Sequence, residues 1–287
     1  MAPPSFGSGA PEEPTRLRQI ALAVTDLEKE VSLLTSILPT HVLYRDPRVS
    51  VWNLHNALLP LGGDILELVS PTSSSAPAAR HIKRNGDGGY MIIMQQQGAK
   101  ERREQLVKSK RARVIWTSDH EESSATQYHP ADVPGGVIPE LDAQYGAGKG
   151  VEVRFGAWHA LGPRHEEYVG GMRETAGLGL LGVVCRLKAG EVDVEGAARR
   201  WRDLFGVAMS RDLVAFTNAR LGFVRGVEGK GAGIESITVG VAGREKLEDV
   251  IKKAREKGVW RGGTHGWAEM CGVKWHFVQT GEETSKL

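Results

Sequence analysis

Short apolar runs and amphipathic segments follow one another along the chain in a fixed order. Runs of apolar or alternating residues predict strands, and apolar residues three or four positions apart predict helices. A strand at 19–24 is followed by a helix that ends near Pro39, and Thr25 with Glu28 forms a capping box at its start. Three strands are then expected, at 42–44, 49–61 and 65–69. The first unit is therefore a strand, a helix and three strands.

The same order returns once in full and twice in weaker form. After a link rich in Pro and Ser, the second unit is expected as a strand at 90–95, a helix at 98–109 and strands at 112–116, 125–129 and 137–141. The third unit has a strand at 180–187, a helix at 194–205 and a hairpin at 213–217 and 220–224. The fourth has a strand at 236–241, a helix at 245–257 and strands at 267–270 and 273–279. Repetition of a whole unit indicates the fold more strongly than any single segment does.

Four such units predict an α+β fold in which tandem βαβββ modules form two cupped mixed sheets. We expect a disordered leader at 1–15, a first domain at 16–145 that holds the site, a linker and connector at 146–178, and a second, structural domain at 179–281. Within the connector, residues 158–172 are expected to be helical.

The composition is that of a globular protein and excludes several classes of partner. The 287 residues leave room for two domains, with 40% hydrophobic and 25% charged residues. A net charge of +2 gives no field that would attract nucleic acid or an anionic membrane. The two cysteines, Cys185 and Cys271, are too few for a disulfide framework and too far apart in sequence for a structural zinc site. We expect a cytoplasmic protein, a monomer or homodimer, whose partner is a small-molecule substrate.

Four segments of the first domain carry a resemblance to a known superfamily. Residues 19–27 read Gln-Ile-Ala-Leu-Ala-Val-Thr-Asp-Leu, 67–71 Glu-Leu-Val-Ser-Pro, 86–93 Gly-Asp-Gly-Gly-Tyr-Met-Ile-Ile, and 129–141 His-Pro-Ala-Asp-Val-Pro-Gly-Gly-Val-Ile-Pro-Glu-Leu. They resemble the motifs of the vicinal oxygen chelate superfamily (glyoxalase I, extradiol dioxygenases, bleomycin-resistance proteins). The nearest likeness is to its methylmalonyl-CoA epimerase-like branch and to two-domain glyoxalase-like proteins.

The resemblance implies four metal-ligand positions, which hold Gln19, Glu67, Met91 and Glu140 in this chain. A glutamine and a methionine therefore stand where the family has histidines. A thioether is a poor partner for hard or borderline divalent ions, and an amide is weaker than an imidazole. No cofactor is expected on this basis; the alternative is a weak divalent-metal site made by Gln19, Glu67 and Glu140. An iron centre with two histidines is excluded at these positions.

Two carboxylates remain at the four positions. If the implied geometry holds, Glu67 and Glu140 converge in one cavity, where two neighbouring carboxyl groups push their proton affinities apart. This predicts an isomerase or lyase that acts on a carbonyl or enol compound, in secondary or in central metabolism. Glu67 and Glu140 would exchange a proton, and Gln19 would hydrogen-bond the substrate oxygen. Met91, Trp52 and Asn56 are the expected substrate contacts.

Two other functions stay open at this point. A metal-free protein that binds and sequesters a small molecule, as bleomycin-resistance proteins do, is favoured by the apolar Met91. An epimerase-like enzyme with a weakly bound divalent metal is favoured by the two carboxylates and Gln19. His159 and His165, in the connector, are expected to be structural, and so is His276, which stands in the second domain where Glu140 stands in the first.

Overall fold

The computed structural model describes residues 12–263 and 266–281. Most of the predicted leader lies outside these residues. Its last residues are attached to the fold, because the amide of Glu13 donates to the carbonyl of Gly206 and the amide of Thr217 donates to the carbonyl of Thr15. The predicted domain boundaries stay predictions. No helix in these ranges is both long and apolar enough to cross a membrane.

The first sheet has seven strands in the described part of the chain, in the order β2-β3-β1-β4-β7-β6-β5. Its strands are β1 (Arg16–Ala23), β2 (Leu54–Leu61), β3 (Asp64–Pro71), β4 (Gly88–Gln95), β5 (Val114–Asp119), β6 (Ser123–Tyr128) and β7 (Ile138–Gln144). The helices among them are α1 (Leu27–Ile37), α2 (Pro77–Asn85), α3 (Ala99–Lys108) and the 3-10 helices η1 (Pro47–Trp52) and η2 (Pro130–Asp132).

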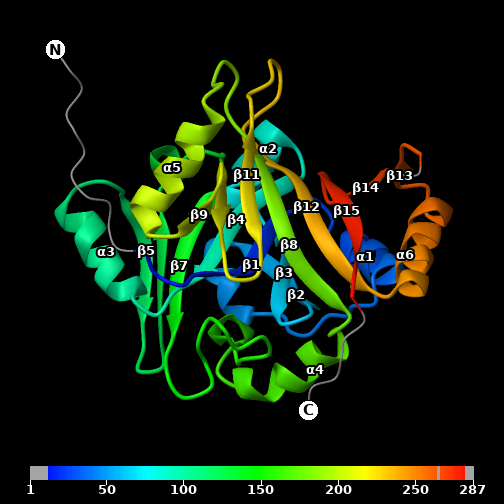
Figure 1. Cartoon of the computed structure of the whole chain (residues 1–287), viewed down its shortest axis with the longest axis horizontal. Coiled ribbons are helices and arrows are strands. Elements are labelled where there is room, and N and C mark those ends of the chain that lie inside the picture. The colour runs from blue at the N-terminus through cyan, green and yellow to red at the C-terminus, as the bar shows by residue number, and fades with distance from the viewer. Residues whose placement is uncertain (1–11, 264–265, 282–287) are drawn as a thin grey trace.

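The second sheet has eight described strands, in the order β13-β14-β15-β12-β8-β11-β10-β9. They are β8 (Leu178–Arg186), β9 (Ala208–Ser210), β10 (Leu213–Ala215), β11 (Arg220–Val224), β12 (Gly233–Ala242), β13 (Trp260–Arg261), β14 (Trp267–Met270) and β15 (Val273–Thr280), with helices α5 (Val194–Phe205) and α6 (Arg244–Glu256). The segment of the chain that connects the two sheets contains η3 (His159–Leu161), η4 (His165–Tyr168) and α4 (Val169–Glu174). Figure 1 shows β8, β11 and β12 crossing in front of the first sheet.

Both sheets are built to one plan. At the centre of the first sheet β1 is antiparallel to β4, and each has a parallel outer neighbour, β3 and β7. At the centre of the second sheet β8 is antiparallel to β12, with β11 and β15 as the parallel neighbours. Each half-sheet is thus one strand–helix–strands unit. The predicted α+β fold with four repeated units in two mixed sheets is confirmed.

A β-bulge interrupts each central strand at an equivalent place. The pairing skips Arg18 in β1 and Tyr90 in β4, and likewise Leu181 in β8 and Glu235 in β12. A bulge adds one residue to a strand and increases its local twist. These bulges help to curl each sheet.

Two apolar clusters hold the molecule together. The larger cluster joins residues of both sheets and of α1, α3, α5 and α6, so the two halves share a continuous core. The smaller cluster covers the other face of the first sheet, where Ala21, Ile65 and Met91 pack with Trp158 and Met172. The connector between the sheets therefore lies on the face of the first sheet that bears the candidate site.

Local structure differs from the sequence-based expectation at the start of the chain. Asp26, not Thr25, caps α1, because its side chain accepts a hydrogen bond from the amide of Lys29. The hydroxyl and amide of Thr25 both donate instead to Asp87, which lies in the loop before β4. The predicted capping box was therefore wrong by one residue, since a partner distant in sequence holds Thr25.

Two predicted strands differ from the observed ones, and the connector is divided into short pieces. The expected strand at 49–61 is divided into η1 and β2 by Asn53, whose φ of 55° is incompatible with a continuous strand. The expected strand at 42–44 is reduced to one isolated bridge between Tyr44 and Leu58. The connector expected to be helical over 158–172 contains three short helical pieces, two 3-10 helices and then α4.

Candidate functional site

Gln19, Glu67, Met91 and Glu140 lie on one face of the first sheet, each on a different strand. In the ladder Gln19 is opposite Ile93, which is opposite Glu140, and Glu67 is opposite Ala21, which is opposite Met91. Residues directly opposite one another share a face of a sheet, so the four side chains occupy two adjacent rows. All four are buried, and the two glutamates are each 7% exposed.

Glu67 is held at both carboxyl oxygens by side-chain amides. Nε2 of Gln19 donates to Oε2 at 2.8 Å, and Nδ2 of Asn56 donates to Oε1 at 2.7 Å. Burial raises the pKa of Glu67 to about 7, against an ordinary value of 4.5, although both hydrogen bonds favour the charged form. The nearby Glu140 raises this pKa further. Glu67 therefore changes protonation near neutral pH.

Gln19 is oriented by the connector. Nε1 of the fully buried Trp158 donates to Oε1 of Gln19 at 2.9 Å, which directs the amide nitrogen of Gln19 toward Glu67. The guanidinium of Arg18 lies 5.2 Å from the centre of the Trp158 ring and donates to the carbonyl of Gly156. A cation over an aromatic face is attractive. The connector and the strand thus position each other, and the carbonyl oxygen of Gln19 already has a donor.

Glu140 is coupled to a third carboxyl group, Asp142. Burial raises the pKa of Glu140 well above its ordinary value, and the charge of Asp142 and a hydrogen bond to it raise it further. Burial raises the pKa of Asp142 to about 8, opposed by the hydrogen bond with Glu140. Two buried carboxyl groups in contact cannot both ionise readily. The pair of Glu140 and Asp142 therefore holds a proton more strongly than an isolated carboxyl group does.

His159 of the connector reaches the same group. Its Nε2 lies 3.0 Å from Oδ2 of Asp142, and its backbone amide donates to Oε1 of Gln144. Burial lowers the pKa of His159 to about 4, so the ring is neutral near pH 7. The sequence did not indicate this contact, since His159 is expected there to be structural.

The predicted substrate contacts occupy different surroundings. Asn56 uses Nδ2 to hold Glu67, and its Oδ1 accepts from the amide of Asp46, so both ends of its amide are engaged. Met91 packs in the smaller apolar cluster. Trp52, at the end of η1, contacts Trp116 of β5 with ring centres 5.6 Å apart. Their roles toward a substrate stay predictions.

The donor set does not fit a divalent metal. Both carboxyl oxygens of Glu67 accept amide hydrogens, and the one carbonyl oxygen of Gln19 accepts the indole hydrogen of Trp158. The fourth position is the thioether of Met91, which binds hard ions poorly. Over the described residues there is also no group of three or more His, Cys, Asp or Glu side chains placed to hold a metal. We therefore derive no step through a metal ion.

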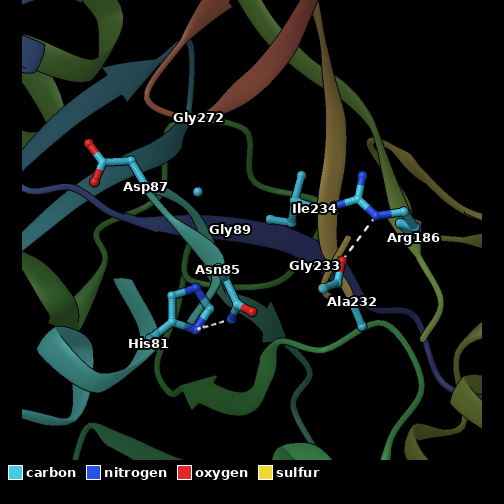
Figure 2. Close-up of a pocket in the computed structure, with 11 residues that line it drawn as sticks. His81, Asn85, Asp87, Gly89, Arg186, Ala232, Gly233, Ile234 and Gly272 are labelled. Carbon is cyan, nitrogen blue, oxygen red and sulfur yellow. Dashed lines mark hydrogen bonds between the residues drawn. The ribbon is translucent and has the colours of Figure 1, made fainter. Parts of the chain in front are cut away.

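A small hollow lies where the two sheets meet. Figure 2 shows it between α2, the start of β4 and the start of β12, with His81 next to Asn85 and with Arg186 bonded to the carbonyl of Gly231. Its volume is about 40 Å³. This is room for a few water molecules and not for an organic substrate. The carboxyl groups of the first sheet are the better candidate site.

Comparisons with known proteins bear on the fold. No protein-family model matches the sequence, and no curated protein does. Among solved structures, a triple mutant of 4-hydroxymandelate synthase from Streptomyces coelicolor is similar over 93% of this chain and 93% of its own, with a TM-score of 0.63 and 12% identity. Methylmalonyl-CoA epimerase from Mycobacterium tuberculosis covers 49% of this chain and 95% of its own, with a TM-score of 0.42 and 21% identity.

A likeness at 12% identity establishes the fold and does not transfer an activity. The similarity to the synthase extends through both sheets, which agrees with four units arranged in two halves. It agrees with the fold that the resemblance of the first domain implies. The chain shares its two-domain fold with 4-hydroxymandelate synthase.

Proposed function

We propose that this protein is a small-molecule enzyme of the isomerase or lyase kind, which moves a proton on the carbon next to a carbonyl group. The observation that carries this proposal is a buried carboxyl group, Glu67, with a pKa of about 7, on the same face of the sheet as Glu140, a carboxyl group whose pKa is raised well above its ordinary value. General acid–base catalysis is most effective when the pKa of the catalytic group is near the working pH.

The two groups have complementary tasks. Ionised Glu67 accepts the proton from the carbon, and the electron pair of the broken C–H bond forms an enolate. Protonated Glu140 donates to the carbonyl oxygen and recovers its proton when the carbonyl re-forms. Transfer of this proton from Glu67 to a different carbon of a conjugated enolate gives isomerisation, and loss of a leaving group from the neighbouring carbon gives elimination.

Several neighbours support these tasks without taking part in bond changes. Gln19 and Asn56 fix both oxygens of Glu67, so they are positioning residues. Nε2 of Gln19 has a second hydrogen, and the expected bond from Gln19 to a substrate oxygen remains part of the proposal. Asp142 keeps Glu140 protonated. A protein that only sequesters a ligand has no need of carboxyl groups adjusted in this way.

The proposal is tested by exchange of carbon-bound hydrogen in deuterated water. Phenylacetone and butanone are the probes, and loss of the methylene signal is followed by NMR. Wild type should accelerate exchange of at least one ketone, and Glu67→Gln should lower that rate at least about a hundredfold. Glu269→Gln, an exposed glutamate of the second sheet, is the matched control and should not change it. Saturable binding without accelerated exchange would support the sequestration alternative.

A further inference from the structure

The connector covers the face of the first sheet that carries Glu67. Its side chains Trp158, Leu161 and Met172 are fully buried and pack in one apolar cluster with Ala21. Ala21 is opposite Glu67 in the ladder between β1 and β3. With the connector in this place Glu67 is 7% exposed. A molecule that comes from solvent to the carboxyl group of Glu67 therefore has to displace part of the connector.

The connector is anchored on both sides of this buried part. Before it, the guanidinium of Arg18 in β1 donates to the carbonyl of Gly156. After it, the guanidinium of Arg154 donates to the carbonyl of Ala176, just before β8, and so ties the two ends of the segment together. Residues 157–174 therefore form a loop with fixed, neighbouring ends that is packed by its own side chains, a form that is often functional.

The attachment of this loop to the first sheet depends on side chains. In the described part of the chain no backbone-to-backbone hydrogen bond joins residues 157–174 to a strand of that sheet. The indole of Trp158 donates to Gln19, and the ring of His159 contacts Asp142. The loop can thus leave the face of the sheet without breaking any strand ladder.

The helix α4, at the end of this loop, is weak by itself. It has six residues, and two of them are the adjacent glycines Gly170 and Gly171. Glycine is unfavourable in a helix, and isolated helices this short are not stable in water. In Figure 1 α4 lies at the lower margin of the molecule, outside both sheets. Segments that depend on a few side-chain contacts in this way are those that open locally.

We propose that residues 157–174 are a lid, which opens as a unit between its two fixed ends and admits the substrate to Glu67. Admission of a substrate rests on the proposed function, whereas the opening itself depends only on how the loop is attached. Opening withdraws Trp158 from Gln19, and closing restores the hydrogen bond that orients this amide. The closed lid also excludes water from the carboxyl groups, as loops that close over reaction sites do.

Exchange of indole hydrogens with deuterated water, followed by NMR, tests the opening without any ligand. Trp158, Trp201 and Trp275 are all fully buried, and each indole N–H donates to an oxygen of the protein. Trp201 and Trp275 lie in the larger apolar cluster and are the matched controls. The indole hydrogen of Trp158 should exchange at least about tenfold faster than the other two, because the lid opens while the core stays folded. Exchange as slow as that of the controls would overturn the lid.

A reversible disulfide tests the admission of substrate. A Cβ at position 171 would lie 3.8 Å from Cγ of Leu43, so Leu43→Cys with Gly171→Cys brings two thiols together, and the native Cys185 and Cys271 are buried. Oxidation with glutathione disulfide should slow the exchange of the Trp158 indole to the rate of the controls. It should also lower the rate of ketone hydrogen exchange at least about tenfold, and dithiothreitol should restore both rates.

The two measurements separate the lid from the proposed function. Ketone exchange that continues at full rate with the disulfide closed would overturn the lid as the way in. Fast exchange of the Trp158 indole that the disulfide slows, in a protein without ketone exchange, would uphold the lid and refute the proposed function. Ketone exchange by a protein whose Trp158 indole is as protected as that of Trp275 would do the reverse.

Discussion

Trp158 and Gln19 are 139 residues apart, and the indole of one donates a 2.9 Å hydrogen bond to the amide oxygen of the other. Through this bond the connector decides which end of the Gln19 amide faces Glu67. A nitrogen donor is presented to the carboxylate, and the oxygen that could have served a metal faces the indole. The fold thus replaces a metal-ligand position with a hydrogen-bonded support for a carboxyl group.

Trp158→Phe removes the indole N–H and leaves a buried amide oxygen without a donor. We expect a loss of about 1–3 kcal/mol in the free energy of unfolding, measured by urea denaturation. The support for ionised Glu67 should also weaken, so the acidic limb of the pH–rate profile should move to higher pH. Trp275→Phe removes a similar buried bond, from Nε1 to the carbonyl of Met270, in the second sheet. That control should lose stability without moving the limb; equal shifts in both variants would contradict the account.

Asn56→Leu removes one of the two hydrogen bonds that favour the charged form of Glu67. The pKa of Glu67 should rise above about 7, and the rate of ketone exchange should reach its plateau at higher pH. The rate at that plateau should fall less than in Glu67→Gln, because the base itself remains. A profile that stays in place, or moves to lower pH, would show that Asn56 does not act on Glu67.

Stability should depend on pH through Glu67 in a defined direction. The pKa in the folded chain is about 7 against an ordinary 4.5, so the folded state holds a proton that the unfolded state releases in between. The contribution of this group is complete below pH 4.5 and is lost as the pH rises to about 7 and beyond. At about 1.4 kcal/mol per pH unit, the loss is about 3 kcal/mol.

Glu67→Gln, which resembles the protonated acid, isolates this effect. The difference in unfolding free energy, wild type minus variant, should fall by that amount as the pH rises across the window. Chemical denaturation at a series of pH values measures it. A difference independent of pH would mean that Glu67 ionises in the folded chain as it does in the unfolded one.

Much of the fold was predictable from the sequence because each unit repeats the same local signals. The strand and helix order, and the strands that carry Glu67 and Glu140, needed only apolar periodicity and the motif resemblance. Errors arose where a residue distant in sequence decides local structure, as where Asp87 binds Thr25. The hydrogen bonds of Trp158 and His159 in the connector were not predicted for the same reason, since their partners lie in β1 and β7. No local pattern encodes such contacts.

Metal binding should be absent or weak. Elemental analysis of the purified protein should find no stoichiometric metal. Titration with Mn²⁺ or Zn²⁺ should give no saturable signal that depends on Glu67 and Glu140. The physical reason is that binding would have to displace the amide and indole hydrogens from Glu67 and Gln19. Near-stoichiometric metal that is lost when Glu67→Ala and Glu140→Ala are combined would make a metal enzyme the correct account.

The most direct test of the central claim is an NMR titration of the carboxyl carbons of Glu67 and Glu140, with isotope-labelled glutamate and with Glu67→Gln and Glu140→Gln to assign the two signals. The account predicts that Glu67 titrates with a midpoint of about 7 and that Glu140 remains protonated well above its ordinary 4.5. Midpoints near 4.5 for both groups would contradict it, because Glu67 and Glu140 would then be two ordinary carboxylates and no acid–base pair.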